Sequence, residues 1–129
     1  MEELDSLRDY QFTKSHEWVR FLNDHQALIG ITHHGQKLLG DLVYITLPAD
    51  EEEIEAGEAF AELASARADS DVYCPVSGRI TKVNMDLLTD PNRITKNPYE
   101  AWMIEVSEIT DHETLLEAGD YQQFLDTEQ

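Results

Sequence analysis

The sequence is poor in basic residues. Its 129 residues include 9 Lys and Arg against 27 Asp and Glu, which gives a formal net charge of −18. A charge of this sign repels phosphate backbones and anionic lipid headgroups, so neither nucleic acid nor a membrane surface is an expected partner. It favours solubility and fast encounters with basic surfaces of other proteins.

Cysteine and long apolar runs are also scarce. Cys74 is the single cysteine, so an internal disulfide is excluded and a reducing compartment is favoured. No segment approaches the roughly 18 apolar residues that a membrane helix needs. The segment Met1–Arg8 is acidic and lacks the basic, apolar and cleavage regions of a signal peptide. We therefore expect a cytoplasmic protein.

The length suits one domain, and the pattern along the chain is mostly that of short strands. We expect a loosely docked tail over residues 1–9 and a single domain over residues 10–129. The predicted strands are residues 26–32, 42–47, 60–65, 71–74, 79–84 and 102–106. Short strands separated by turns every 8–12 residues or so predict a small sandwich or barrel.

Helices are expected at a few places. Thr32 can cap a short helix over residues 33–39, which Gly40 would end with a positive φ. Residues 86–98 are expected to form helical turns and loop. Residues 113–126 are expected to be helical, with Asp120 capping a second piece. In the strand over residues 42–47, alternation places Val43, Ile45 and Leu47 on one face. Residues 75–78, Pro-Val-Ser-Gly, have the composition of a turn.

The side chains alone do not indicate an enzyme. No phosphate-binding glycine loop is present. Cys74 could pair with a histidine as a nucleophile, but it precedes Pro75 with no evident cation beside it, so a structural thiol is the better interpretation. His33 and His34 together with His16 could suggest a metal site. The adjacent pair cannot readily bind one ion together, so surface histidines near a helix start are favoured. The acidic run over residues 51–55 indicates a solvated loop.

Four blocks of the sequence resemble the glycine cleavage system H protein family, in the family's order and over about residues 10–125. The blocks are SHEWVR at residues 15–20, IGITHHGQKLLGDLVYITLP at 29–48, DVYCPVSG at 71–78, and NPY at 97–99 leading to Trp102. The second block is the most specific. Together the four blocks make a chance resemblance untenable.

The resemblance implies a mainly β fold, a lipoyl-domain-like β-sandwich (barrel-sandwich hybrid) with short peripheral helices and a C-terminal helix. It also implies a carrier that is not itself a catalyst. In the family, a lipoylated lysine on a hairpin tip accepts aminomethyl from glycine decarboxylase. The arm then visits an aminomethyltransferase that uses tetrahydrofolate, and afterwards dihydrolipoyl dehydrogenase. Those three enzymes and the lipoylation enzymes are the implied partners, and a monomer is expected.

The position of the family's lysine is occupied by Arg67. The family segment resembles ESVKA, and here it reads Ala64-Ser65-Ala66-Arg67-Ala68, with no gap needed on either side. The family's glutamate three residues before the lysine is Ala64 here. The glycine usually found before the tryptophan is Ala101.

Arginine cannot replace the lysine chemically. Lipoylation needs a neutral amine as the nucleophile, whereas a guanidinium stays protonated and its nitrogen lone pairs are delocalised. We therefore expect no lipoate on this chain. Arg67 is then either a solvated tip residue of a paralogue that lost the modification or a cation offered to an acidic partner, and the first is favoured.

Two acidic residues also match family positions. In the family, the glutamate of the HEW motif and the aspartate shortly after the lysine lie near the resting groove of the arm, and these are Glu17 and Asp71 here. The alternative is that both are ordinary surface acids. We expect a non-lipoylated binding or regulatory paralogue. The alternatives are a working H protein carrier with its lysine substituted in this chain, or a scaffold subunit in another pathway.

Overall fold

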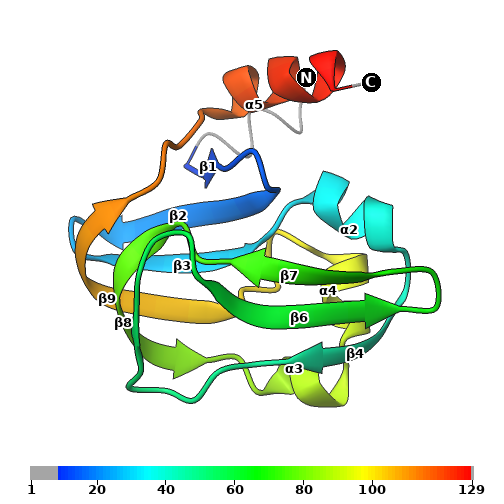
Figure 1. Ribbon diagram of the computed structural model, residues 1–129, viewed down its shortest axis with the longest axis horizontal. Coiled ribbons are helices and arrows are strands. Elements are labelled where there is room, and N and C mark those ends of the chain that lie inside the picture. Colours follow the sequence, from blue (N-terminus) through cyan, green and yellow to red (C-terminus); the bar gives the residue numbers. More distant parts are fainter. Residues whose placement is uncertain (1–8, 129) are drawn as a thin grey trace.

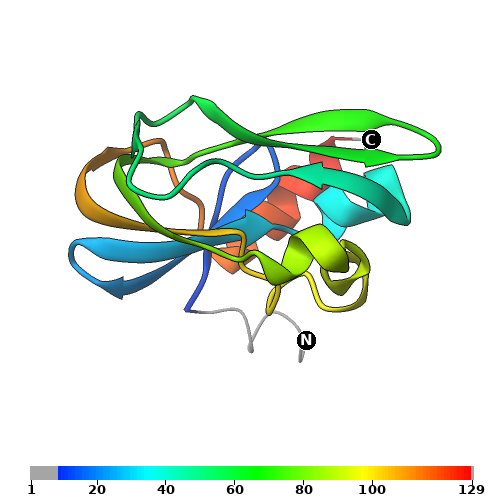
Figure 2. The same ribbon diagram turned by 90° about the horizontal axis from the view of Figure 1, so that it is seen from below.

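The computed structural model describes residues 9–128 and shows a β-sandwich. One antiparallel sheet has six strands in the order β1-β2-β3-β9-β8-β5, and the other has three in the order β4-β6-β7. The three-stranded sheet lies over the larger one, as Figure 2 shows. The strands are β1 (Gln11–Phe12), β2 (Glu17–Asn23), β3 (Gln26–Ile31), β4 (Leu42–Thr46), β5 (Glu53–Ile54), β6 (Ala59–Ser65), β7 (Asp69–Tyr73), β8 (Val76–Val83) and β9 (Ile104–His112). The expected sandwich is confirmed.

Short helices lie at the margins of the two sheets (Figure 1). They are α2 (His33–Leu39), α3 (Asp86–Thr89), α4 (Asn92–Lys96) and the C-terminal α5 (Ala118–Thr127). The predicted tail over residues 1–9 falls outside the described part of the chain, apart from Asp9. No helix within residues 9–128 is long and apolar enough to cross a membrane.

Helix α2 begins and ends as the sequence predicts. The Thr32 hydroxyl accepts a hydrogen bond from the Gly35 amide at 3.1 Å, which satisfies one of the free donors of the first turn. Gly40 has a φ of +84°, which glycine adopts without strain, and its amide donates to the Gln36 carbonyl at 2.9 Å. A side chain at position 40 would also collide with the Arg67 guanidinium.

Two apolar clusters hold the fold together. The larger fills the space between the sheets; its most buried strand residues include Val19, Ile29, Leu63, Ile80 and Ile104. The smaller fastens α5 to the first strands and contains Phe12, Trp18, Ala118 and Tyr121. Phe12 stacks on Tyr121 with 4.7 Å between ring centroids. The C-terminal helix is therefore attached by aromatic packing.

Alternation along β4 was predicted wrongly at Val43. Leu42 and Ile45 are buried, whereas Val43 is 67% exposed. The pairing of β4 with β6 shifts register between Leu42 and Tyr44, as at a β-bulge. Such an irregularity turns the following side chains to the other face, which alternation alone cannot foresee.

Several segment boundaries also differ from the predictions. Val76, Ser77 and Gly78 belong to β8 and are not a turn. Strand β9 spans Ile104–His112 rather than residues 102–106. Helix α5 begins at Ala118 with Glu117 as its N-cap, so Asp120 lies in its first turn and is not a cap. Strand β9 continues past the predicted end because its pairing with β8 extends to His112.

Candidate functional site

The β6–β7 hairpin ends in a tight turn that presents Arg67. The Ser65 amide donates to the Ala68 carbonyl at 2.8 Å, which closes the turn. The Ser65 hydroxyl accepts from the amides of Arg67 at 3.2 Å and Ala68 at 3.1 Å. Ala66 and Arg67 are exposed at the apex. The turn is shorter than the predicted polar tip, because residues 69 and 70 already belong to β7.

The Arg67 side chain is folded back onto α2. Its Nε donates to the carbonyl of Leu39, the last residue of that helix, at 3.2 Å. Carbonyls at a helix C-terminus lack partners within the helix and carry partial negative charge, so a cation there is favourable. Arg67 thus joins the hairpin to α2, which sequence reasoning did not foresee because the two segments are 28 residues apart.

Glu17 is a buried carboxylate with three donors. It is 2% exposed. Its Oε1 accepts from the hydroxyls of Thr13 at 2.7 Å and Ser15 at 2.5 Å, and its Oε2 accepts from the Tyr73 amide at 3.2 Å. Burial raises the pKa of Glu17 above its ordinary value, and these hydrogen bonds oppose that rise. Glu17 therefore connects the β1–β2 turn to β7 and is not an ordinary surface acid.

Glu17 and Asp71 line the same cavity, which lies between α2 and the β6–β7 hairpin and has a volume of about 240 Å³. Its wall also includes Ala68, next to Arg67, together with Leu38 and Leu39 of α2. The Asp71 side chain is exposed at its rim. Whether this cavity holds an arm stays a prediction, but both acids are on the same side as the hairpin.

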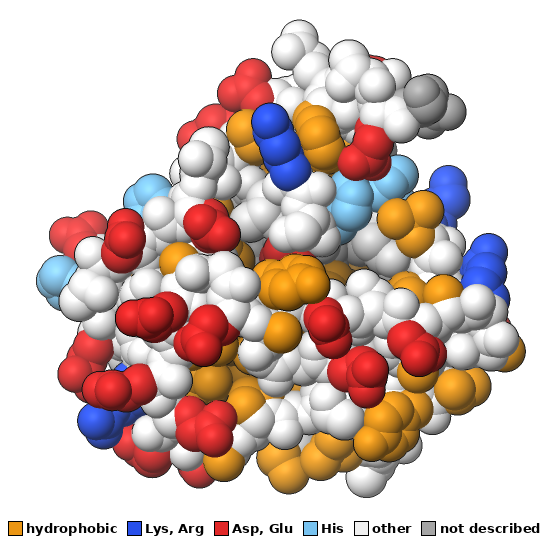
Figure 3. Space-filling model, viewed as in Figure 1, with side chains coloured by type: hydrophobic (Ala, Val, Ile, Leu, Met, Phe, Trp, Pro, Cys, Tyr) orange, Lys and Arg blue, Asp and Glu red, His pale blue; other side chains and the backbone are white. Residues whose placement is uncertain are grey.

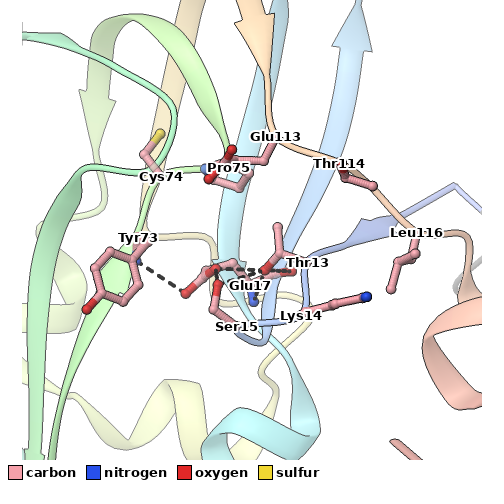
Figure 4. Close-up of a pocket in the computed structure, with 10 residues that line it drawn as sticks. All are labelled: Thr13, Lys14, Ser15, Glu17, Tyr73, Cys74, Pro75, Glu113, Thr114 and Leu116. Atoms are coloured by element: carbon pink, nitrogen blue, oxygen red, sulfur yellow. Dashed lines mark hydrogen bonds between the residues drawn. The ribbon is translucent and has the colours of Figure 1, made fainter. Parts of the chain in front are cut away.

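A second cavity of about 560 Å³ also borders Glu17 (Figure 4). Ser15 and Glu17 line both cavities. Tyr73 at the end of β7 and Cys74 after it are part of its wall, as are Lys14 and Glu113.

Removing the Glu17 carboxylate should destabilise the fold. We expect Glu17→Ala to lower the free energy of unfolding by about 1–3 kcal/mol, because it leaves part-buried donors without an acceptor. Glu17→Gln should cost less than Glu17→Ala. Its oxygen can accept from the Tyr73 amide, while the hydroxyls of Thr13 and Ser15 rotate to accept from its NH₂. Urea unfolding measures both.

The matched control for Glu17 is Asp71→Ala. Asp71 is an exposed acid on the rim of the same cavity, and its substitution should change the free energy of unfolding by less than about 0.5 kcal/mol. If Glu17→Ala cost no more than Asp71→Ala, the buried hydrogen bonds would contribute nothing net.

Cys74 is a structural thiol. Its side chain has no exposure, and its Sγ–H donates to the Val76 carbonyl at 3.2 Å. Burial, followed by the nearby charges of Glu17 and Glu58, raises the pKa of the thiol to about 12. The thiolate is the reactive form, so this cysteine is poorly suited to act as a nucleophile.

The native protein should therefore resist alkylation at Cys74. At pH 8 we expect iodoacetamide to react at least about 100-fold more slowly with the folded chain than with the chain in urea, since both thiolate population and access are reduced. Mass spectrometry over a time course measures the two rates. Equal rates would mean that the thiol is open to solvent in the folded state.

The histidines are arranged in a way the sequence did not indicate. His33 is exposed and does not join the other two. His34 packs against His16, with 4.6 Å between ring centroids. Burial and the nearby His34 lower the pKa of His16, while Glu128 opposes that shift. The sequence suggested a metal site from His33, His34 and His16, and surface histidines were favoured. No local pattern shows that residue 34 would face residue 16.

The acidic run over residues 51–55 is largely exposed, as expected, although Ile54 is buried and Glu53 pairs in β5. The Arg79 Nη1 of β8 lies 3.2 Å from the Glu51 Oε2, and the Arg79 Nε lies 3.8 Å from the Glu108 Oε2. These ion pairs are exposed and contribute little to stability.

Comparison with known proteins places the chain in a family. Residues 10–128 match the family model described as glycine cleavage H-protein. The glycine cleavage system H protein of Lachnoclostridium phytofermentans is 43% identical over 122 residues, which cover 95% of this chain and 96% of that protein. The probable glycine cleavage system H protein of Pyrococcus furiosus is 42% identical over 119 residues, covering 90% and 89%.

A solved structure agrees with these relatives. The crystal structure of a glycine cleavage system H protein from Mycobacterium marinum superimposes with a TM-score of 0.87 at 34% sequence identity, covering 92% of this chain and 98% of that one. The lipoyl-domain-like fold expected from the sequence is therefore confirmed. This chain belongs to the glycine cleavage H-protein family, whose members are carriers and not themselves catalysts.

Proposed function

We propose that this chain is an H-protein-like module that is not lipoylated at the family's position and acts by binding other proteins. The observation that carries the proposal is Arg67 at the apex of the β6–β7 turn, with its side chain tied to the Leu39 carbonyl. A guanidinium cannot form the amide that holds a lipoyl arm, because it stays protonated with its lone pairs delocalised.

No lysine stands in for Arg67. The sequence contains four, Lys14, Lys37, Lys82 and Lys96, and none belongs to the turn between β6 and β7. Lys14 lies over the Phe124 ring at 5.5 Å from its centroid, on the side of α5. A lipoylation enzyme that recognises the hairpin would meet only Arg67 there.

The partners proposed are those of the glycine cleavage system, namely glycine decarboxylase, the aminomethyltransferase and dihydrolipoyl dehydrogenase, together with the lipoylation enzymes. The preserved hairpin, the shared fold and the acidic cavity rim support this proposal. A protein that offers this surface without a lipoyl arm would occupy a partner enzyme's docking site, and the enzyme's reaction could not proceed there. A cytoplasmic location and a monomeric state remain part of the proposal.

Two other functions are kept as alternatives. The chain could be a carrier whose lysine is replaced only in this form, or a scaffold subunit of another pathway that retains the fold. Neighbouring genes for the decarboxylase and aminomethyltransferase would favour either the proposed non-lipoylated module or the carrier over the scaffold subunit.

Intact mass spectrometry tests the proposal. The chain is expressed beside active lipoylation enzymes and free lipoate, with a lysine-containing H protein in the same cells as control. The control should gain one lipoyl group and this chain none. Lipoylation of any residue in this chain would overturn the proposal.

Docking is tested separately. Added to a glycine exchange assay driven by a lipoylated H protein, this chain should not support exchange and should inhibit it competitively. Absence of inhibition at a large molar excess would favour the scaffold alternative instead.

A further inference from the structure

Three side chains from distant segments converge beneath the C-terminal helix. His16 lies in the turn before β2, His34 in the first turn of α2, and Glu128 at the end of α5. The Nε2 atoms of His16 and His34 each lie 3.6 Å from the same Glu128 Oε1. One ligand atom from each of the three residues lies within 4.8 Å of the others. Figure 3 shows histidine side chains gathered next to this helix.

The His16 ring is oriented from behind. Its Nδ1 lies 2.7 Å from the Tyr121 hydroxyl, which in turn lies 2.8 Å from the Thr32 hydroxyl. Thr32 is fixed as the N-cap of α2. A hydrogen bond at one ring nitrogen sets the tautomer and leaves the other for a ligand; metal-binding histidines generally show this arrangement.

The backbone also shapes this corner. His16 has a φ of +74°, a conformation that residues other than glycine adopt infrequently. Its amide donates to the Thr13 carbonyl at 3.1 Å, and its carbonyl accepts from the Thr32 amide at 3.0 Å. The ring is thus held between the β1–β2 turn and the start of α2.

We propose that His16, His34 and Glu128 form a binding site for a divalent cation of the zinc type, which fastens α5 to α2. Two imidazoles and a carboxylate suit Zn²⁺ and are a poor set for Ca²⁺ or Mg²⁺, which take oxygen ligands. Three protein ligands leave a fourth position for water or an external ligand.

The distances fit such a site after a small closure. Zinc lies about 2.0–2.2 Å from nitrogen and oxygen ligands, so tetrahedral neighbours are about 3.3–3.5 Å apart. Both histidine–carboxylate distances, at 3.6 Å, are already near this value. The Glu128 and His34 side chains are 41% and 30% exposed, so both are free to adjust around the more fixed His16.

Isothermal titration calorimetry with Zn²⁺ tests the site, using the full chain without a histidine tag. Excess Mg²⁺ in the buffer saturates the many exposed carboxylates. We expect one zinc equivalent, bound at least 10-fold more weakly by His34→Ala. His33→Ala is the matched control, because it removes the adjacent exposed imidazole outside the cluster. It should bind as the unsubstituted protein does.

Tyr121→Phe tests the positioning contact. It keeps the ring that stacks on Phe12 and removes only the hydroxyl beside His16. Loss of such a supporting group typically weakens metal binding about 10–100-fold, so a drop of about 10-fold is expected. Melting curves without metal show whether each variant folds.

The readouts separate specific from adventitious binding. Co²⁺ bound to the chain should give the intense visible absorption of tetrahedral coordination, and His34→Ala should abolish it. Equal zinc affinity in His34→Ala and the unsubstituted protein, or an equal loss in His33→Ala, would show adventitious binding only and overturn the proposal. None of these measurements depends on the lipoylation state of the chain.

Discussion

Arg67→Lys should turn this chain into a partial substrate for lipoylation. The change supplies an amine that can lose its proton, on a turn that is closed by backbone and Ser65 hydrogen bonds and not by the Arg67 side chain. It also removes the Nε donor that binds the Leu39 carbonyl, so the new side chain is freer to extend. Intact mass after expression with lipoylation enzymes measures the modified fraction.

The neighbouring residue should limit that fraction. By the resemblance to the family, a glutamate is expected at the position of Ala64, and a charge there can help an enzyme orient the turn. Arg67→Lys combined with Ala64→Glu should therefore be modified more completely than Arg67→Lys alone. Ala64 lies opposite Asp69 in the β6–β7 pairing, so the added carboxylate carries a small cost in stability from like charges.

The appropriate control is Ala66→Lys, which offers an amine one residue away on the same exposed turn. The Ala66→Lys variant should remain unmodified if the lipoylation enzyme recognises the position of the lysine in the turn and not merely the presence of a lysine. If neither Arg67 variant accepted lipoate while a lysine-containing H protein did so, the turn itself would have diverged. The scaffold alternative would then gain support.

The regular parts of the fold follow from local rules in the sequence. Apolar and β-branched residues predicted β3, a short strand was expected over residues 60–65 where β6 forms, and the Thr32 cap with Gly40 predicted both ends of α2. These features depend on residues close together in the chain, so sequence patterns report them well. The bulge in β4 was not predicted, because it arises from pairing with β6, which alternation within one strand does not encode.

The candidate site was predictable only in part. The resemblance to the family pointed to Arg67, Glu17 and Asp71, whose roles stay predictions, whereas composition and spacing alone pointed to none of them. Contacts between residues far apart in the chain could not be predicted from the sequence. Examples are Arg67 with Leu39 and His16 with His34. Burial of Glu17 was also not predicted, because a glutamate at the start of a strand is usually exposed.

Trp18 is expected to be the most sensitive single position in the second apolar cluster. Its side chain is 1% exposed, and its Nε1–H donates to the Pro98 carbonyl at 2.9 Å, across 80 residues of sequence. Tyr10 packs edge-on against it at 5.0 Å between centroids. Trp18→Ala should lower the free energy of unfolding by about 3–5 kcal/mol, since it opens a large cavity and leaves a buried carbonyl without its donor.

Gly30 explains how the strand accommodates this ring. The two residues face each other across β2 and β3, and a Cβ at position 30 would lie 2.6 Å from the nearest Trp18 ring carbon. Gly30→Ala alone should therefore cost about 1–3 kcal/mol through overpacking. In a Trp18→Leu background the same substitution should cost much less, because the smaller side chain leaves room for the methyl group.

A double-mutant cycle over Trp18→Leu and Gly30→Ala, measured by urea unfolding, isolates this effect. Residues in contact typically show interaction energies of about 0.5–3 kcal/mol, and here the sign should be favourable to the double variant. Trp18→Leu keeps an apolar side chain and provides a folded reference if Trp18→Ala does not fold. Strict additivity of the two substitutions would show that the Trp18 ring does not occupy the space above Gly30.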